Sequence, residues 1–427
     1  MSAVEERSVS PASAAGLANY PWQLIGLLWT AAFLNSAGRQ ILITVLPQVR
    51  AEFGLSATQL ALINSVGFWI YAVCALIFGR LGDATHRSRL IVGGLAFWAV
   101  ATGMVSVATG LIVLVMIRGL VAAGEATYYP TAAALISDWH RSGTRSRALS
   151  IHQTGVFAGA GVGAVAAGAL ADAFGWRSPF LIFGILALVF CAVLFKWLRD
   201  PPAAPSQGVA PSAASSTGPL RTVLRKPAAL MLCLVFFLAN GAVCGIIVWA
   251  PTFLHDELGL DLAASALYGS ATLSAAGVVC VPLGGFLAHR LAARTPLAVF
   301  YVLAIGLALA GLLLLPLRVA TTAFAVGAVL FASGAGKGLF DGCIYAAMHD
   351  VVPPAARATA VGLMTLVGFC GAGLSPIAVA QVSGWIGMAP AMTSLAFLYL
   401  AAAVLLIATR SSTRQAILET REIEDRR

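Results

Sequence analysis

Charge is scarce in this chain. Asp, Glu, Lys and Arg make up 10% of its 427 residues, hydrophobic residues make up 59%, and the mean hydropathy is +0.90. Soluble globular domains carry roughly 25% charged residues, so this composition excludes a water-soluble globule. The net charge of +9 gives little support for nucleic-acid binding, because the basic residues follow the pattern of membrane topology.

The chain also lacks the residue sets of enzymes and metal sites. Its seven cysteines all fall within apolar segments, and none of their spacings is typical of metal ligands or disulfides. No pair of nucleophile and base stands out in the sequence. We therefore expect no enzymatic activity, no bound metal and no cofactor.

Long apolar runs are abundant, and they fall into two sets of six. A helix needs about 20 apolar residues to cross about 30 Å of hydrocarbon. The first set covers residues 22–46, 58–79, 89–108, 110–137, 147–171 and 178–198. The second set covers residues 228–253, 263–287, 296–316, 319–348, 357–384 and 388–409. The sequence predicts an all-α polytopic membrane protein with twelve transmembrane helices in two pseudo-symmetric six-helix bundles.

An internal repeat relates the two halves at an offset of 212 residues. The matching positions are Asp138 with Asp350, Arg145 with Arg357, and Ala148 with Ala360. The same offset places Glu125 opposite Lys337. Between the halves lies a segment rich in Pro, Ala and Ser, which is typical of a flexible linker. We expect a tail over 1–20, a bundle over 21–199, the linker over 200–226, a second bundle over 227–410 and a tail over 411–427.

Basic residues predict the orientation in the membrane. With an intracellular N-terminus, all but six of the 26 Lys and Arg fall in cytoplasmic segments. The six are Arg39, Arg50, Arg118, Arg177, Arg318 and Lys337. By the positive-inside rule both termini are cytoplasmic. We expect a monomer in the plasma (inner) membrane.

The loop after the second span reads GRLGDATHRSR and resembles the loop between helices two and three of the major facilitator superfamily. The residues that match the family's pattern are Gly79, Leu81, Asp83 and Arg87, whereas Ala84, His86 and Ser88 depart from it. A degenerate copy, GGFLAHRLAAR, follows the eighth span. The resemblance implies the major facilitator fold over residues 20–410 and a gating role for Asp83 and Arg87.

The fourth and fifth spans resemble one branch of this superfamily in particular. RGLVAAGEATYYP, followed by SDWH and ALSIHQTG, resembles the branch that contains anion:cation symporters of sugar acids and organic anions, together with spinster-like lipid transporters. The resemblance implies that Tyr71 contacts substrate and that Gln153 and His152 lie at the cavity. The alternative is that they are hydrogen-bonded packing residues. Members of this branch usually carry an acid before the first-span arginine, where this chain has Gly38.

Ionisable residues inside the predicted spans mark a candidate transport pathway, because burying charge in hydrocarbon is expensive. Arg118 and Glu125 are seven residues apart, so they share one face of a helix, which Tyr129 extends. Lys337 and Asp341 are four apart; they either line the cavity or neutralise each other. Together with Arg39, the buried charges would leave a net charge of +1, which favours an anionic substrate.

The sequence thus predicts a secondary active transporter of a small organic anion, a carboxylate or sugar acid, that works by alternating access and takes protons as its second partner. We expect Glu125 and His152 to serve proton coupling, with Arg118 beside Glu125. The predicted substrate-binding residues are Arg39, Tyr71, Arg118, Tyr129, Gln153, Lys337 and Asp341. The alternatives are an exporter of amphiphilic drugs or lysolipids, a uniporter or exchanger of organic anions, and a membrane receptor or scaffold that transports nothing.

Overall fold

The computed structural model describes residues 11–84, 86–140, 142–201, 218–353 and 356–425, and helices form nearly all of these. The first half contains α1 (Pro11–Phe53), α2 (Ala57–Ala84), α3 (Arg87–Met104), η1 (Val105–Val107), α4 (Leu111–Ala126), α5 (Tyr128–Trp139), α6 (Ser142–Phe174) and α7 (Arg177–Trp197), and α8 (Gly218–Leu224) follows in the linker. The second half contains α9 (Pro227–Leu258), α10 (Leu262–Ala266), η2 (Leu267–Ala271), α11 (Thr272–Ala292), α12 (Ala298–Leu314), η3 (Leu315–Val319), α13 (Ala323–Asp341), α14 (Ile344–Val351), α15 (Arg357–Ile386), α16 (Met388–Ala408) and α17 (Arg410–Asp425).

Within the described residues, eleven helical segments are long and apolar enough to cross a membrane. Five of them join shorter elements: Arg87–Val107, Leu111–Trp139, Leu262–Ala292, Ala298–Val319 and Ala323–Val351. The helix α1 is not among the eleven, since Asn35, Arg39 and Gln40 dilute its apolar middle. It is nevertheless 43 residues long and packs along α6 inside the first bundle. With α1 the spans number twelve, as the sequence predicts.

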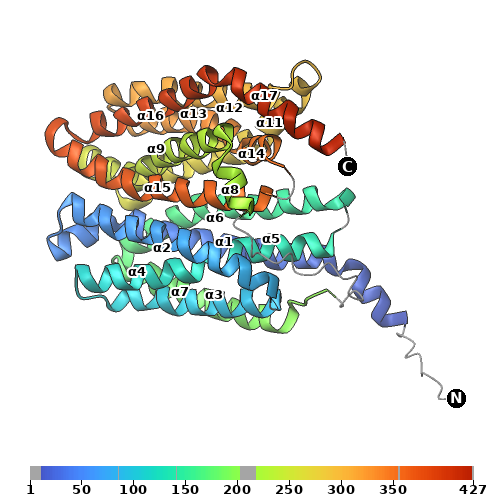
Figure 1. The fold of residues 1–427 in the computed structure, drawn as a ribbon. Coiled ribbons are helices and arrows are strands. Elements are labelled where there is room, and N and C mark those ends of the chain that lie inside the picture. The colour runs from blue at the N-terminus through green and yellow to red at the C-terminus, as the bar shows by residue number, and fades with distance from the viewer. Residues whose placement is uncertain (1–10, 85, 141, 202–217, 354–355, 426–427) are drawn as a thin grey trace.

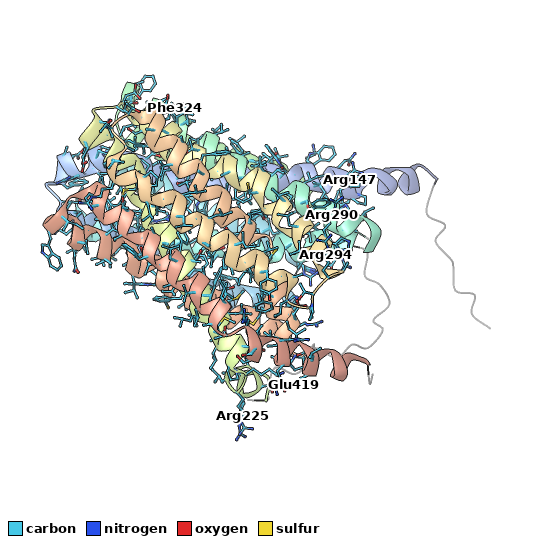
Figure 2. The ribbon with its side chains drawn as sticks, turned by 90° about the horizontal axis from the view of Figure 1, so that it is seen from above. Arg147, Arg225, Arg290, Arg294, Phe324 and Glu419 are labelled. Atoms are coloured by element: carbon cyan, nitrogen blue, oxygen red, sulfur yellow. The ribbon has the colours of Figure 1, made fainter. Side chains whose placement is uncertain are left out.

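The two halves form two bundles that lie side by side, coloured blue to green and yellow to red in Figure 1. The start of α1 and the end of α17 lie at the same end of the molecule (Figure 1). Basic residues gather toward that end: Arg147, Arg290 and Arg294 lie there, far from Phe324 at the opposite end (Figure 2). This distribution follows the charge asymmetry of the sequence.

Glycines allow the same close helix contact in each bundle. A Cβ atom on Gly159 of α6 would lie 2.3 Å from the carbonyl oxygen of Phe33 on α1. Gly371 of α15, 212 residues further on, would place a Cβ atom 2.4 Å from the carbonyl oxygen of Phe237 on α9. Only a residue without a side chain permits this approach. The repeat in the sequence is therefore also a repeat in packing.

The fourth and tenth spans are interrupted where the sequence suggests continuous runs. In the fourth span α4 ends at Ala126 and α5 begins at Tyr128, just after Glu125; in the tenth, α13 ends at Asp341 and α14 begins at Ile344. Pro130 follows the first break, and a proline removes one backbone donor from a helix. Both breaks lie beside charged residues deep in the protein, where irregular backbone is tolerated because it lines a cavity or is covered by protein.

Candidate functional site

Glu125, near the end of α4, lies between two arginines. Its side chain is 2% exposed, and its carboxylate lies 3.3 Å from Nε of Arg39 on α1 and 3.4 Å from Nη1 of Arg118 on α4. The seven-residue spacing does bring Arg118 and Glu125 together on one helix face. Because a single carboxylate serves two guanidinium groups, this cluster carries one positive charge in excess.

Arg39 is the member of the cluster that reaches open space. Its side chain is 31% exposed, whereas that of Arg118 is 7% exposed. The Arg39 guanidinium lies 4.9 Å from the centre of the Tyr71 ring. In this conformation Arg39 can meet a ligand directly, and Arg118 can act only through Glu125.

Tyr129 and Gln153 form a polar wall beside this cluster. The hydroxyl of Tyr129 donates to Oε1 of Gln153 at 2.9 Å, and Tyr129 is exposed. Behind them, the hydroxyl of Tyr128 donates to the carbonyl of Leu28 and lies 2.9 Å from Nε2 of His152. Tyr128 and His152 are both buried, so a ligand would sense His152 only through its neighbours.

The second bundle contributes an ion pair and a tyrosine. Nζ of Lys337 lies 2.5 Å from Oδ1 of Asp341; the lysine is buried, whereas the aspartate is 38% exposed. The two charges therefore neutralise each other, and the side chain of Asp341 stays partly exposed. Tyr345 of α14 is exposed, and the centre of its ring lies 6.3 Å from that of Phe236.

The walls from the two halves face one site. Tyr71 stacks on Phe369 of α15 with ring centres 4.9 Å apart. The indole N–H of Trp69, on the same helix as Tyr71, donates a hydrogen bond of 3.5 Å to the carbonyl of Cys370. The charges at this site are thus three cations and two anions, a net charge of +1, and the excess lies on the side of Arg39.

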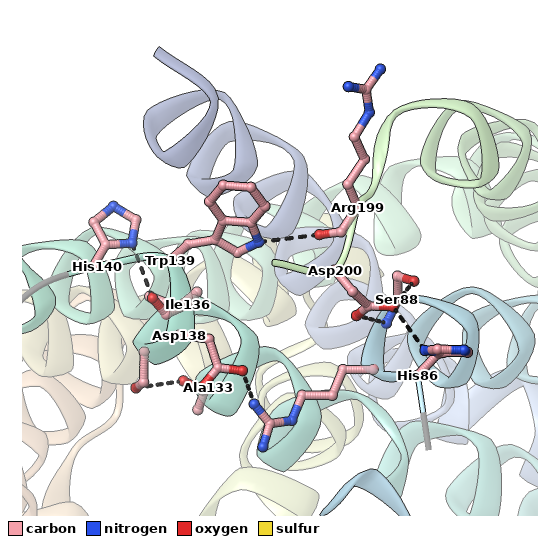
Figure 3. A network of polar contacts seen from close by, with 11 residues as sticks. His86, Ser88, Ala133, Ile136, Asp138, Trp139, His140, Arg199 and Asp200 are labelled. Atoms are coloured by element: carbon pink, nitrogen blue, oxygen red, sulfur yellow. Dashed lines mark hydrogen bonds and ion pairs between the residues drawn. The ribbon is translucent and has the colours of Figure 1, made fainter. Parts of the chain in front are cut away.

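The predicted gating residues lie away from this site, at the end of the first bundle that carries many basic residues. Arg87, at the start of α3, pairs with Asp138 in the last turn of α5 (Figure 3). Asp200, beyond α7, accepts hydrogen bonds from the N–H and hydroxyl of Ser88 at 2.9 and 2.7 Å (Figure 3). Asp83 lies in the last turn of α2, and its side chain falls outside the described residues. These contacts join the start of α3 to the ends of α5 and α7 within the first bundle. The gating role of Asp83 and Arg87 stays a prediction.

Two further contacts between the halves lie at the opposite end. Arg50 of α1 lies 3.2 Å from Asp256 of α9. Asp172 of α6 accepts hydrogen bonds from the backbone N–H groups of Leu262 and Ala263 at 3.2 and 3.0 Å, where α10 begins. Sequence reasoning missed Asp172 and Asp256, because neither has a spacing that relates it to its partner.

A second ion pair at this end lies within the first bundle. Arg177 donates two hydrogen bonds, of 2.6 and 2.7 Å, to the carboxylate of Glu52. The indole N–H of Trp176 donates a third at 2.6 Å. The Arg177 guanidinium, followed by Trp176, holds the pKa of Glu52 below its ordinary value of 4.5.

Sequence reasoning also missed two buried aromatic residues near the charges. Trp98 of α3 is fully buried, and its ring lies against Gly38. In apolar runs, aromatic residues are normally core residues, so neither Trp98 nor Tyr128 stood out. For Tyr128 the three-residue spacing from Glu125 was an available signal, since residues three apart are neighbours on a helix. Among the residues that the structure describes, no group of three His, Cys, Asp or Glu side chains could hold a metal ion.

Two helical bundles with buried charges on their facing walls define a polytopic membrane protein with a polar site between its halves. Comparison with known proteins gives the family. A model of the Major Facilitator Superfamily matches residues 28–331. The chain belongs to this superfamily, whose members are membrane transporters and not enzymes.

Several curated proteins are similar to the chain. Protein spinster homolog 1 of Homo sapiens is 31% identical over 303 residues, which cover 66% of this chain and 57% of that protein. The hexuronate transporter of Bacillus subtilis is 26% identical over 243 residues, or 56% of this chain and 58% of that protein. A probable sulfoacetate transporter of Cupriavidus necator is 27% identical over 326 residues, or 73% of this chain and 75% of that protein. The chain thus spans somewhat more than half the length of the first two relatives.

The fold is also that of solved structures. A bacterial homologue of the human lysosomal transporter spinster, in an inward-facing and unoccupied conformation, superposes with a TM-score of 0.77 at 22% identity, covering 94% of this chain and 98% of that chain. The major facilitator fold expected from the sequence is therefore confirmed.

Proposed function

We propose that this chain is a secondary active transporter of a small organic anion, a carboxylate or sugar acid, coupled to protons. One observation carries the proposal: Arg39 is paired with Glu125 and is still 31% exposed. An anion that enters the site meets a guanidinium whose planar set of donors suits a carboxylate. The similarity to proteins named as transporters of hexuronate and sulfoacetate supports an acid as the substrate.

Substrate and proton are linked because both act on the same ion pair. Glu125 holds Arg39 only as a charged carboxylate, so protonation of Glu125 releases the guanidinium to the anion. A bound anion, in turn, draws Arg39 away and leaves Glu125 with Arg118 alone. Each ligand then favours the binding of the other, as thermodynamic linkage requires. Two ligands that favour each other's binding at one site are suited to move together.

The remainder of the site favours a hydroxylated substrate. Tyr71, Tyr129, Gln153 and Tyr345 offer hydroxyl and amide groups, and Asp341 offers a partly exposed carboxylate oxygen. Polar groups of this kind lose free energy when an alkyl chain covers them without hydrogen bonds. A sugar acid satisfies them, and an alkyl chain does not. The second candidate, an exporter of amphiphilic drugs or lysolipids, has its support in the similarity to spinster homolog 1.

Alternating access needs contacts that break when one end of the site opens. The Arg50 to Asp256 pair and the contacts of Asp172 with the start of α10 join the halves at one end. We assign that end to the outside. The end that carries Arg147 and Arg290 (Figure 2) then faces the cytoplasm, by the positive-inside rule. The proposal places the chain in the plasma (inner) membrane as a monomer.

A thermal-shift screen of the purified protein tests the substrate class. Glucuronate, sulfoacetate, phosphate, a lysolipid and a cationic drug are each added at two pH values. A ligand at a hundred times its dissociation constant adds about 2.7 kcal/mol to stability, which is easily seen. We expect an organic acid to stabilise the wild type and not Arg39→Gln. Arg318→Gln is the charge-matched control, because Arg318 is exposed and it loses the same charge.

The other outcomes are equally informative. Stabilisation by the lysolipid or the cation alone contradicts the organic-anion proposal and favours the exporter. Binding of an acid without proton-driven accumulation in liposomes favours a uniporter or an exchanger.

A further inference from the structure

Trp98 of α3 contacts the backbone beside both partners of the Arg39 to Glu125 ion pair. The residue before Arg39 is Gly38, where a Cβ atom would lie 2.2 Å from Cζ2 and 3.0 Å from Cη2 of the indole. The residue before Glu125 is Gly124, where a Cβ atom would lie 2.8 Å from Cβ and 2.9 Å from Cα of Trp98. Any side chain at either glycine would overlap the tryptophan.

The two contacts use opposite ends of the same residue. Gly124 meets the main chain and Cβ of Trp98, so α3 and α4 cross at backbone contact. Gly38 of α1 meets the far edge of the six-membered ring. The indole therefore lies between α1 and the crossing of α3 with α4, and its length sets their separation. Trp98 is fully buried, and close packing leaves such a ring little freedom to move. The indole therefore acts as a spacer of fixed length between the helices that carry Arg39 and Glu125.

The separation that this spacer sets is critical for the ion pair. The distance from Nε of Arg39 to Oε2 of Glu125 is 3.3 Å, just beyond the usual hydrogen-bond range of about 2.7 to 3.2 Å. A shift of a few tenths of an ångström in α1 either strengthens or breaks such a contact. Arg118, the third member of the cluster, also packs against a glycine. A Cβ atom on Gly67 of α2 would lie 2.9 Å from its Nε atom.

We propose that Trp98 is a positioning residue that sets the strength of the Arg39 to Glu125 pair. In the proposed transport cycle, on which this role rests, Trp98 thereby sets how strongly anion and proton are coupled. A residue that only filled the core would contribute to stability without affecting the interaction between these two charges.

A double-mutant cycle measures that interaction without a substrate. Melting temperatures are compared for wild type, Arg39→Gln, Glu125→Gln and the double variant, and the non-additive part of the shifts reports the pair. The cycle is repeated in Gly38→Ala, in Trp98→Phe, and in Gly38→Ala/Trp98→Phe. Gly26→Ala is the matched control on α1, because a Cβ atom there meets nothing within 4 Å.

We expect the non-additive part to be equal in wild type and Gly26→Ala and to fall at least twofold in Gly38→Ala, where the new methyl group pushes α1 off the indole. Trp98→Phe removes Cζ2 and Cη2, so it should also weaken the interaction by itself. The combined variant should regain the interaction, because the new methyl group then occupies space that the shorter ring leaves free.

An interaction of unchanged size in Gly38→Ala and in Trp98→Phe would overturn the proposal, even if both variants melt earlier, since Trp98 would then be only a packing residue. If Gly38→Ala does not fold, the comparison of Trp98→Phe with wild type decides alone. Uptake of glucuronate into liposomes is measured separately. An interaction that follows Trp98 in a protein that transports no acid would refute the proposed function and leave the role of Trp98 standing.

Discussion

Replacement of Glu125 by Gln removes the one carboxylate that the two arginines share. The amide keeps the shape of the side chain and an acceptor oxygen, but it cannot carry a proton at neutral pH. Arg39, which is partly exposed, becomes available to an anion, and the charge of the site rises from +1 to +2. We therefore expect Glu125→Gln to keep or raise anion affinity and to lose the link to the proton gradient.

The size of the effect follows from the number of buried carboxylates in the cluster. Glu125 is the single acid that contacts Arg39 and Arg118 in the part of the chain that the structure describes, so one proton would move per monoanion. One pH unit corresponds to about 1.36 kcal/mol, and about 1.4 kcal/mol is a factor of ten in concentration. A one-unit gradient should thus drive about tenfold accumulation in the wild type and none in Glu125→Gln.

The assay uses liposomes with a one-unit pH gradient and labelled glucuronate, or whichever acid the thermal-shift screen selects. Exchange of internal for external label is measured in the same liposomes without a gradient. Glu125→Gln should exchange at a rate within a few-fold of wild type, which shows that it folds and binds. Tenfold accumulation by Glu125→Gln would refute the coupling scheme, because the proton would then have to travel by another group.

Three further predictions concern polar contacts within the site and at the outer end. Asp341→Asn leaves the buried Lys337 without its partner and should cost about 3 kcal/mol of stability, whereas Lys337→Met/Asp341→Asn should recover most of it in thermal unfolding. Asp172→Asn removes a charge-assisted cap at the start of α10, which should cost about 1 kcal/mol. With spin labels on the ends of α1 and α9, the fraction of molecules in which the labels are far apart should then rise about fivefold. An unchanged distance distribution would show that this contact does not hold the end closed. Arg177 lowers the pKa of Glu52, so their pair should stabilise the fold above pH 4.5 and lose its effect as the pH falls through the native pKa. The melting temperatures of wild type and Glu52→Gln should therefore differ at pH 7 and converge at acid pH. A difference that stays constant with pH would refute this prediction.

The sequence was sufficient for those parts of the site that lie on one helix. The spacing of Arg118 and Glu125 predicts a shared face, and the spacing of Lys337 and Asp341 predicts a contact within one turn; both contacts occur. Helical periodicity fixes such relations, because residues four or seven apart face the same way whatever the helix packs against. The twelve spans could be predicted for a similar reason, since hydrocarbon thickness sets helix length.

Contacts between helices could not be read in this way. Arg39 is 86 residues from Glu125, and no local pattern says which face of α1 meets α4. The outer contacts of Asp172 and Asp256 depend on how the two bundles meet. The contribution of Trp98 follows from two glycines that are far apart in the sequence and close only in the fold. Such relations depend on tertiary packing, which a single sequence does not specify in detail.

The unequal burial of the two arginines explains why a shared carboxylate can serve as a switch. If Arg39 and Arg118 were both buried, neither could leave Glu125 for a ligand, and the cluster would be only a structural salt bridge. If both were open, two anions would compete with Glu125, and the link between one proton and one substrate would be lost. With Arg118 at 7% and Arg39 at 31% exposure, one arginine keeps Glu125 in place and the other can leave it. Arg118→Lys keeps the charge but loses the paired donors, so it should weaken proton-driven accumulation more than substrate binding. Arg39→Lys should weaken both. The ratio of accumulation to binding in the two variants tests this division of roles.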